Sequence, residues 1–430
     1  MAAELPPIDV GQVNDHRQNP IDSFHQSNDP RSQVTATVNL GATLPDVTVK
    51  EVVVGESLLN PSAHTVVTLQ SAMYAAPQNW DNFRCQPITV SISDNDTTSG
   101  NPRTMQISQH VYRCDNRKFT NVNTGQVEEL SLHSIDNAIL KDAETIFEKS
   151  WKCASPGAVV QEALQKIGVN QVRFSPGTTG PGRPYVAESI HPLQVVQQQA
   201  SVALWNGDDP SYVHYNTINE NTGQTVHHFR ALGELMSASQ HTPYHLYAAD
   251  SGITGLTAFA YSGSFAPLAM RTAVSFNFPC DYDVLSDVLN GISCGGKYIN
   301  DVKTFNLADG NFSSAMGALS TAGNIFKSLT NAGTAKQQNA CETNVEKYLL
   351  KRQARMGLLD RNKIALRITI PWSPWLHVGQ LIHFHWYNRY DPSLEQYGSG
   401  KYMILHLTHN IQYGGYAVTN LDCIANTYGS

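Results

Sequence analysis

The chain has 430 residues, of which 41% are hydrophobic and only 15% are charged, and its formal net charge is −7. No apolar run approaches the roughly 18 residues of a membrane span, no secretory leader is recognisable and no polybasic block occurs. We therefore expect neither membrane insertion nor a nucleic-acid-coating surface. Asn, Gln, Ser and Thr replace the missing charges, which suits a chain that packs against many neighbours.

The first 148 residues predict an arm followed by a β domain. Residues 1–32 mix prolines with Asn, Asp and Gln and are expected to be an extended arm. Residues 33–148 contain short runs of period two, rich in β-branched residues and bounded by Gly, Pro, Asn or Asp. These runs are 34–38, 47–54, 64–70, 88–92, 105–108 and 127–132. Six strands at this spacing predict a small antiparallel barrel or sandwich.

Residues 149–250 predict an α+β insert that begins with a helix. Ser155 and Pro156 suit the start of this helix, and Gly168 suits its end. Four apolar residues between them form one stripe: Val160, Ala163, Leu164 and Ile167. A Gly/Pro-rich loop is expected over 175–184.

The rest of the insert predicts a second helix and a hairpin. Pro192 opens the helix, and Asn206-Gly207 is expected to end it. Strands are expected at 212–215 and 225–230, with the turn at 219–223.

The last 180 residues are expected to lead into a second β domain. Residues 251–310 predict a strand-rich connecting segment with one short helix, parts of which could complete the first barrel. Residues 311–360 predict a linker and a helix, and 361–430 a second β-barrel domain. The expected solvent side of that helix carries Lys347, Lys351, Arg352 and Arg355.

Two histidines offer the most specific metal signal. His383 and His385 lie two residues apart, so a strand places them on the same face. A metal site needs further ligands, and His406 and His409 are three residues apart, on opposite faces of a neighbouring strand. The alternative is a pair of polar residues on an exposed or interfacial face, and we predict no metal and no cofactor.

Enzyme motifs are missing from the sequence. It contains no G-x-S-x-G, HEXXH or phosphate-binding glycine motif. A dyad could be drawn from His214, His227 or His228 with Asp208-Asp209, but such a dyad depends on geometry that sequence does not supply. The seven scattered cysteines lack C-x-x-C spacing, so reduced thiols are expected. We predict that the protein is not an enzyme and has no catalytic residue.

Two surface features predict contacts with other molecules. Trp372 and Trp375 lie in a proline-stiffened loop and are predicted as interface residues, although both rings could instead plug the end of the local core. The Lys/Arg cluster over 347–363 could meet phosphate, but a solvated helix face is favoured.

The C-terminal segments resemble a known family. They read LHVGQLIHF at 376–384, GSGKYMI at 398–404, HLTH at 406–409 and GGYAVTNLDC at 414–423. These sequence motifs are similar to those of the last barrel in the baseplate hub proteins of contractile-tailed phages. Such hub proteins resemble the T-even phage hub and the hub part of type VI secretion spike proteins. The order of elements over 35–426 is similar as well.

The resemblance implies a structural role. Such hubs are α+β, mainly β proteins with two small tube-type barrels per chain, assembled as a homotrimeric ring of six barrels. The ring joins a threefold central spike to the sixfold tail tube, contacts other baseplate proteins and lets DNA pass without specific binding. We expect the same here, in the virion's tail baseplate, with the spike as a separate chain. The alternative is a carbohydrate-binding or carbohydrate-degrading β-rich tail or receptor-binding protein.

Overall fold

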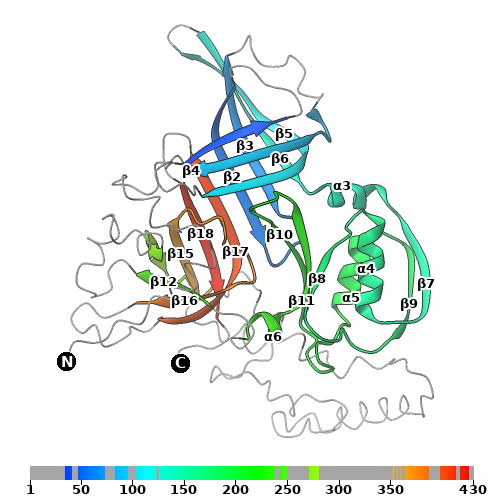
Figure 1. The fold of residues 1–430 in the computed structure, drawn as a ribbon. Coiled ribbons are helices and arrows are strands. Elements are labelled where there is room, and N and C mark those ends of the chain that lie inside the picture. The colour runs from blue at the N-terminus through cyan, green and yellow to red at the C-terminus, as the bar shows by residue number, and fades with distance from the viewer. Residues whose placement is uncertain are drawn as a thin grey trace, which may run out of the picture.

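The structure is a computed structural model, and it describes residues 34–40, 47–72, 83–94, 103–122, 125–237, 243–248, 271–279, 352, 356, 359, 364–386, 398–412 and 417–425. It is mainly β with a helical unit on one side (Figure 1), as the sequence predicts. The expected arm 1–32, the linker 311–340 and the short helix of the connecting segment lie outside the described residues.

The first β block is an antiparallel array. Its strands are β1 (Val34–Asn39), β2 (Val47–Ser57), β3 (His64–Ala72), β4 (Pro87–Asp94), β5 (Thr104–Val122) and β6 (Gly125–Ile135). Their order is β1-β4-β5-β6-β3-β2. Along β4, the side chains of Ile88, Val90 and Ile92 are buried and those between them are not. This alternation is what the period-two pattern predicts for a strand with one face on a core.

The second β block combines distant parts of the chain. Its strands are β12 (Tyr244–Ala248), β13 (Thr272–Ala273), β14 (Ser275–Asn277), β15 (Leu366–Pro371), β16 (Leu381–His385), β17 (Gly400–Gln412) and β18 (Ala417–Ile424). β12 is parallel to both β13 and β16. Thus the described part of the connecting segment, residues 271–279, completes the second β block and not the first.

The insert lies between the blocks in sequence and beside them in space (Figure 1). Its elements are α3 (Asn137–Glu144), β7 (Phe147–Ala154), α4 (Pro156–Lys166), β8 (Val172–Phe174), β9 (Arg183–Ile190), α5 (Pro192–Ala200), β10 (Tyr212–Ile218), β11 (Thr225–Ala231) and α6 (Leu232–Leu235). Helices α4 and α5 lie between a β10-β11-β8 sheet and a β7-β9 ribbon. No helix among the described residues is long and apolar enough to cross a membrane.

Helix α4 has the predicted boundaries. Pro156 is its first residue, and the Ser155 hydroxyl accepts a hydrogen bond from the Ala158 amide at 3.4 Å. Gly168 follows the helix with φ +90°, a conformation that costs glycine little. The four residues of the predicted stripe are all buried. Local sequence therefore determines both ends of this helix and the face that it buries.

Removing the cap should weaken the insert by a small, measurable amount. Ser155→Ala leaves an amide of the first turn without its acceptor, so we expect a loss of about 1 kcal/mol in the free energy of unfolding. Urea denaturation followed by circular dichroism measures it. Ser150→Ala is the control, because Ser150 is an exposed serine on β7; an equal loss in both variants would contradict a capping role.

The insert differs from expectation in the end of one helix and in five elements that were not predicted, namely α3, β7, β8, β9 and α6. Helix α5 ends at Ala200 and not at Asn206-Gly207, because the chain turns away and the Leu204 amide donates to the Thr179 carbonyl at 2.9 Å. Asn206 and Gly207 form the next turn, with φ of 51° and 83°. Strands β7 and β9 were not predicted: most side chains of β7 are exposed on both faces, so its sequence lacks a period-two signal.

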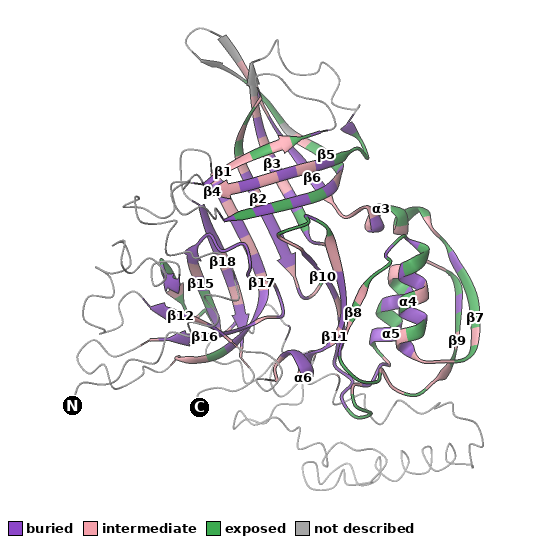
Figure 2. Ribbon diagram, in the orientation of Figure 1, coloured by how far each residue is buried: buried purple, intermediate pink, exposed green. Residues whose placement is uncertain are grey.

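Among the described residues, buried side chains form three core clusters. Figure 2 marks the buried residues along the ribbon in purple. The insert has its own core. The other two exchange residues, because the core of the first β block includes Trp372, Ile411 and Ala417, and that of the second includes Leu58. The two β blocks are therefore packed into one another.

The cysteines differ in part from the expectation of reduced thiols. Cys153 is disulfide-bonded, whereas Cys85, Cys114 and Cys423 are reduced thiols. Cys85 and Cys114 are exposed, and burial raises the pKa of the Cys423 thiol. The sequence could not reveal the disulfide, because no cysteine spacing identifies a pairing.

Candidate functional site

The two β blocks meet at a continuous backbone joint, formed by β2 and β17. β2 pairs with β3 on one edge and with β17 on the other. β17 pairs with β16 up to Met403 and with β2 from His406 onward, and a bulge between Ile404 and His406 lies where the neighbour changes. A bulge bends and twists a strand. It thus lets one strand belong to both blocks.

A buried ion pair supports this joint from the side of the first block. The Arg103 Nε donates to Asp94 Oδ2 at 2.8 Å, and both side chains are 1% exposed. The same guanidinium donates to the Trp372 carbonyl at 2.5 Å and lies over the Trp372 ring at 5.5 Å. Since a charged pair without water depends on its hydrogen bonds, these contacts hold a loop of the second block against the first.

The predicted interface tryptophans are buried within the chain. Trp372 is 0% exposed and packs into the core of the first β block, whereas Trp375 is 6% exposed and packs into that of the second. This matches the alternative in which both rings plug local cores. Their loop places one ring in each core and so fastens the two blocks together. Direct contact with a partner chain stays a prediction.

A second buried charged group connects three segments. The Glu56 side chain on β2 is 0% exposed and lies 3.1 Å from the Nδ1 of His377, whose Nε2 is 3.4 Å from Glu220 in the hairpin turn. Glu56 also accepts from the amides of Ile218 and Val378, at 2.8 and 3.3 Å. Burial opposes the charge of His377, but the two carboxylates outweigh it and raise the pKa of His377 to about 10.

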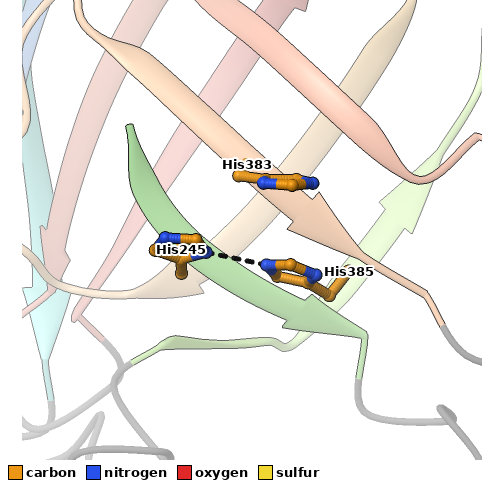
Figure 3. A group of neighbouring side chains, drawn as sticks. All are labelled: His245, His383 and His385. Atoms are coloured by element: carbon orange, nitrogen blue, oxygen red, sulfur yellow. Dashed lines mark hydrogen bonds between the residues drawn. The ribbon is translucent and has the colours of Figure 1, made fainter. Parts of the chain in front are cut away.

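The two histidines of the predicted metal signal lie on β16. A third histidine, on the neighbouring strand β12, lies beside them (Figure 3). His245 on β12 is the register partner of His383, and the possible ligand atoms of His245, His383 and His385 all lie within 4.8 Å of one another. His409 is buried on β17 and bonds Thr419 at 2.9 Å, away from this group. Sequence reasoning missed His245 because it lies 140 residues from His385 along the chain.

His214 and His227 of the hairpin form a structural chain and not the imagined dyad. His227 Nε2 lies 2.8 Å from Asp136 Oδ2, and His214 Nε2 lies 3.1 Å from His227 Nδ1. Asp136 also caps α3. Asp209 instead accepts from the Ser211 amide at 3.1 Å. The arrangement ties the start of α3 to the hairpin.

Arg352 corrects the expected solvent-facing helix side. Its Nη1 donates to the carbonyls of Ala200 and Pro210, both at 2.7 Å, and burial lowers its pKa to about 10. Arg352 lines a cavity of about 670 Å³ between the loop 58–61 and α5. The neighbouring Lys347, Lys351 and Arg355 lie outside the described residues.

Comparison with known proteins gives a fold likeness. Neither a family model nor a curated protein sequence matches the chain. The tail protein of Neisseria meningitidis MC58 is 10% identical, with a TM-score of 0.50 over 92% of this chain and 98% of that one. The chain therefore shares its fold with that protein.

Two further solved structures are similar at 10% identity. The 43 kDa tail protein of prophage MuSo2 from Shewanella oneidensis has a TM-score of 0.45, over 90% of this chain and 97% of its own. An Escherichia coli component of the type VI secretion system, described as structurally similar to T4 bacteriophage tail proteins gp27 and gp5, has a TM-score of 0.46, over 92% and 78%. The family resemblance expected from the sequence is confirmed at the level of fold by the likeness to the tail protein of Neisseria meningitidis.

Proposed function

We propose that the chain is a structural baseplate hub of a contractile phage tail. Three copies would form a ring of pseudo-sixfold symmetry that joins a central spike to the tail tube, contacts other baseplate proteins and lines the DNA conduit. The observation that carries this proposal is the pair of β blocks merged through the joint, in a chain whose fold matches a tail protein over nearly its whole length. A ring needs each chain to present two similar units in a fixed relation.

The course of the strands supports a barrel-like form for each block. In the first block β1 and β2, the two ends of the strand order, contact one another. In the second block, β13 and β14 follow one another closely in the sequence. β13 pairs with β12 and β14 pairs with β15, so these two strands stand at opposite ends of the strand order. The end strands of each array lie near one another, as they would in a small barrel, although no pairing among the described strands closes either array.

The surface and charge fit a structural role. Three chains that each supply two barrels require head-to-tail contacts between neighbours. A surface of neutral polar residues can be buried in such contacts without leaving many charged groups buried and unpaired. The net charge of −7 also suits a conduit through which DNA passes without binding, because like charges repel.

The mass of the assembly tests the proposal. Light scattering during size-exclusion chromatography at micromolar concentration should give three times the 47.2 kDa of one chain, either alone or after addition of the spike protein. Electron microscopy of that species should show six lobes around a channel. A monomer under both conditions would overturn the proposal, and cleavage or specific binding of a polysaccharide by that monomer would favour the carbohydrate-directed alternative.

A further inference from the structure

We propose that His245, His383 and His385 bind a divalent transition-metal ion, with Zn²⁺ as the reference ion. Among the described residues, these side chains form the group of three or more His, Cys, Asp or Glu whose possible ligand atoms converge within 4.8 Å. The inference is independent of the proposed hub function, because it rests on this group alone.

The backbone of the second β block holds the three histidines together. β12 and β16 are parallel neighbours, and their register pairs His245 with His383 and Tyr247 with His385. Register partners and residues two positions along a strand lie on one face of a sheet. The three imidazoles therefore come from two hydrogen-bonded strands, and no loop has to order to bring them together (Figure 3).

The rings are close enough for one ion to bridge them. His245 Nδ1 and His385 Nε2 are 2.7 Å apart, and the rings of His383 and His385 stack at 4.2 Å between centroids. Two nitrogens bound to one Zn²⁺ at a tetrahedral angle are about 3.4 Å apart. Binding therefore needs that pair to open by about 0.7 Å and the rings to turn about soft χ2 torsions. The ring that donates the present hydrogen bond must also move its proton to its other nitrogen, so that the nitrogen facing the ion has a free lone pair.

The donor set selects the class of metal. Three neutral imidazoles suit zinc, nickel, cobalt or copper, whereas magnesium and calcium prefer oxygen ligands. Three histidines with a water in the fourth position make a known form of tetrahedral zinc site. His385 is 3% exposed and the other two are half-buried, so the group is not sealed from solvent.

A bound ion would clamp β12 onto the second β block. β12 has five residues, and the chain reaches its neighbour β16 only after more than a hundred further residues. An ion that binds only the folded arrangement stabilises it in proportion to the logarithm of its concentration over Kd. The site thus provides a cross-link between segments that the sequence keeps far apart.

Titration calorimetry with Zn²⁺ alone tests the site on the full chain without a polyhistidine tag. We expect one ion per chain with a micromolar or lower Kd, and no heat with Mg²⁺. The thermal midpoint should rise with excess Zn²⁺ and fall back after addition of EDTA. Absence of Zn²⁺ binding would overturn the proposal.

Variants and spectroscopy assign the ligands. His383→Gln and His245→Gln should each weaken binding at least tenfold, since even outer partners of metal ligands contribute about 10- to 100-fold. His64→Gln, at an exposed histidine on β3, should leave binding unchanged. X-ray absorption of the Zn²⁺-loaded native chain should show three imidazole ligands, which keeps the test valid if a variant fails to fold. Unchanged binding in both cluster variants, or a zinc spectrum without imidazole, would contradict the assignment.

Discussion

Replacing Arg103 by alanine is expected to lower the free energy of unfolding by about 3–5 kcal/mol. The change leaves the Asp94 carboxylate buried without its guanidinium, and it removes the donor to the Trp372 carbonyl. An unpaired buried charge is much more costly than the pair was favourable. Urea denaturation followed by tryptophan fluorescence measures the loss, and Trp372 at the joint is one of the six tryptophans that contribute to the signal.

Two comparisons isolate the effect of burial. Arg367→Ala removes an ion pair with Asp422 of nearly the same length, 2.9 Å, whose side chains are 51% and 30% exposed. That variant should lose no more than about 1 kcal/mol. The double variant Asp94→Asn with Arg103→Met should recover part of the stability, because it leaves no net charge buried. Equal losses in Arg103→Ala and Arg367→Ala would show that the buried pair does not support the joint.

The Arg103 contacts illustrate what sequence analysis could and could not predict. Periodicity within one element was sufficient for β4 and for α4, where the spacing of apolar residues and a capping serine reflect local rules. The joint depends on which strands pair and in what register. Arg103 and the Trp372 carbonyl are 269 residues apart, and no local pattern at either position indicates the other.

The histidine group on β12 and β16 shows the same difference between local and long-range information. The spacing of His383 and His385 correctly predicted a shared face, because two residues on one strand obey a local rule. His245 joins them only through the parallel pairing of β12 with β16, which joins strands separated by most of the second half of the chain. Sequence likewise misplaced Arg352, since the carbonyls that it binds belong to another unit.

The stability of the chain should fall as the pH rises from about 6.5 to about 10, because of His377. The pKa of its imidazole is about 10 in the folded chain, against an ordinary value of 6.5. A raised folded pKa means that the stabilisation is complete below pH 6.5, where both states are protonated. It is lost as the pH approaches 10, at roughly 1.4 kcal/mol per pH unit. Urea denaturation at intervals across this range measures the slope.

Glu56→Gln separates this contribution from other groups that titrate in the same range. Glutamine keeps one oxygen, which can accept from either the Ile218 or the Val378 amide but not from both, because they donate to different oxygens of Glu56. It also removes the charge that stabilises the imidazolium. The variant should be less stable near pH 6.5 and should show a flatter profile above it. His133→Gln is the control, since it removes a partly exposed histidine–carboxylate pair, with Asp115, within the first block. If Glu56→Gln and the native chain lost stability in parallel between pH 6.5 and 10, the charge on His377 could not be what fastens the hairpin turn and the second β block to β2.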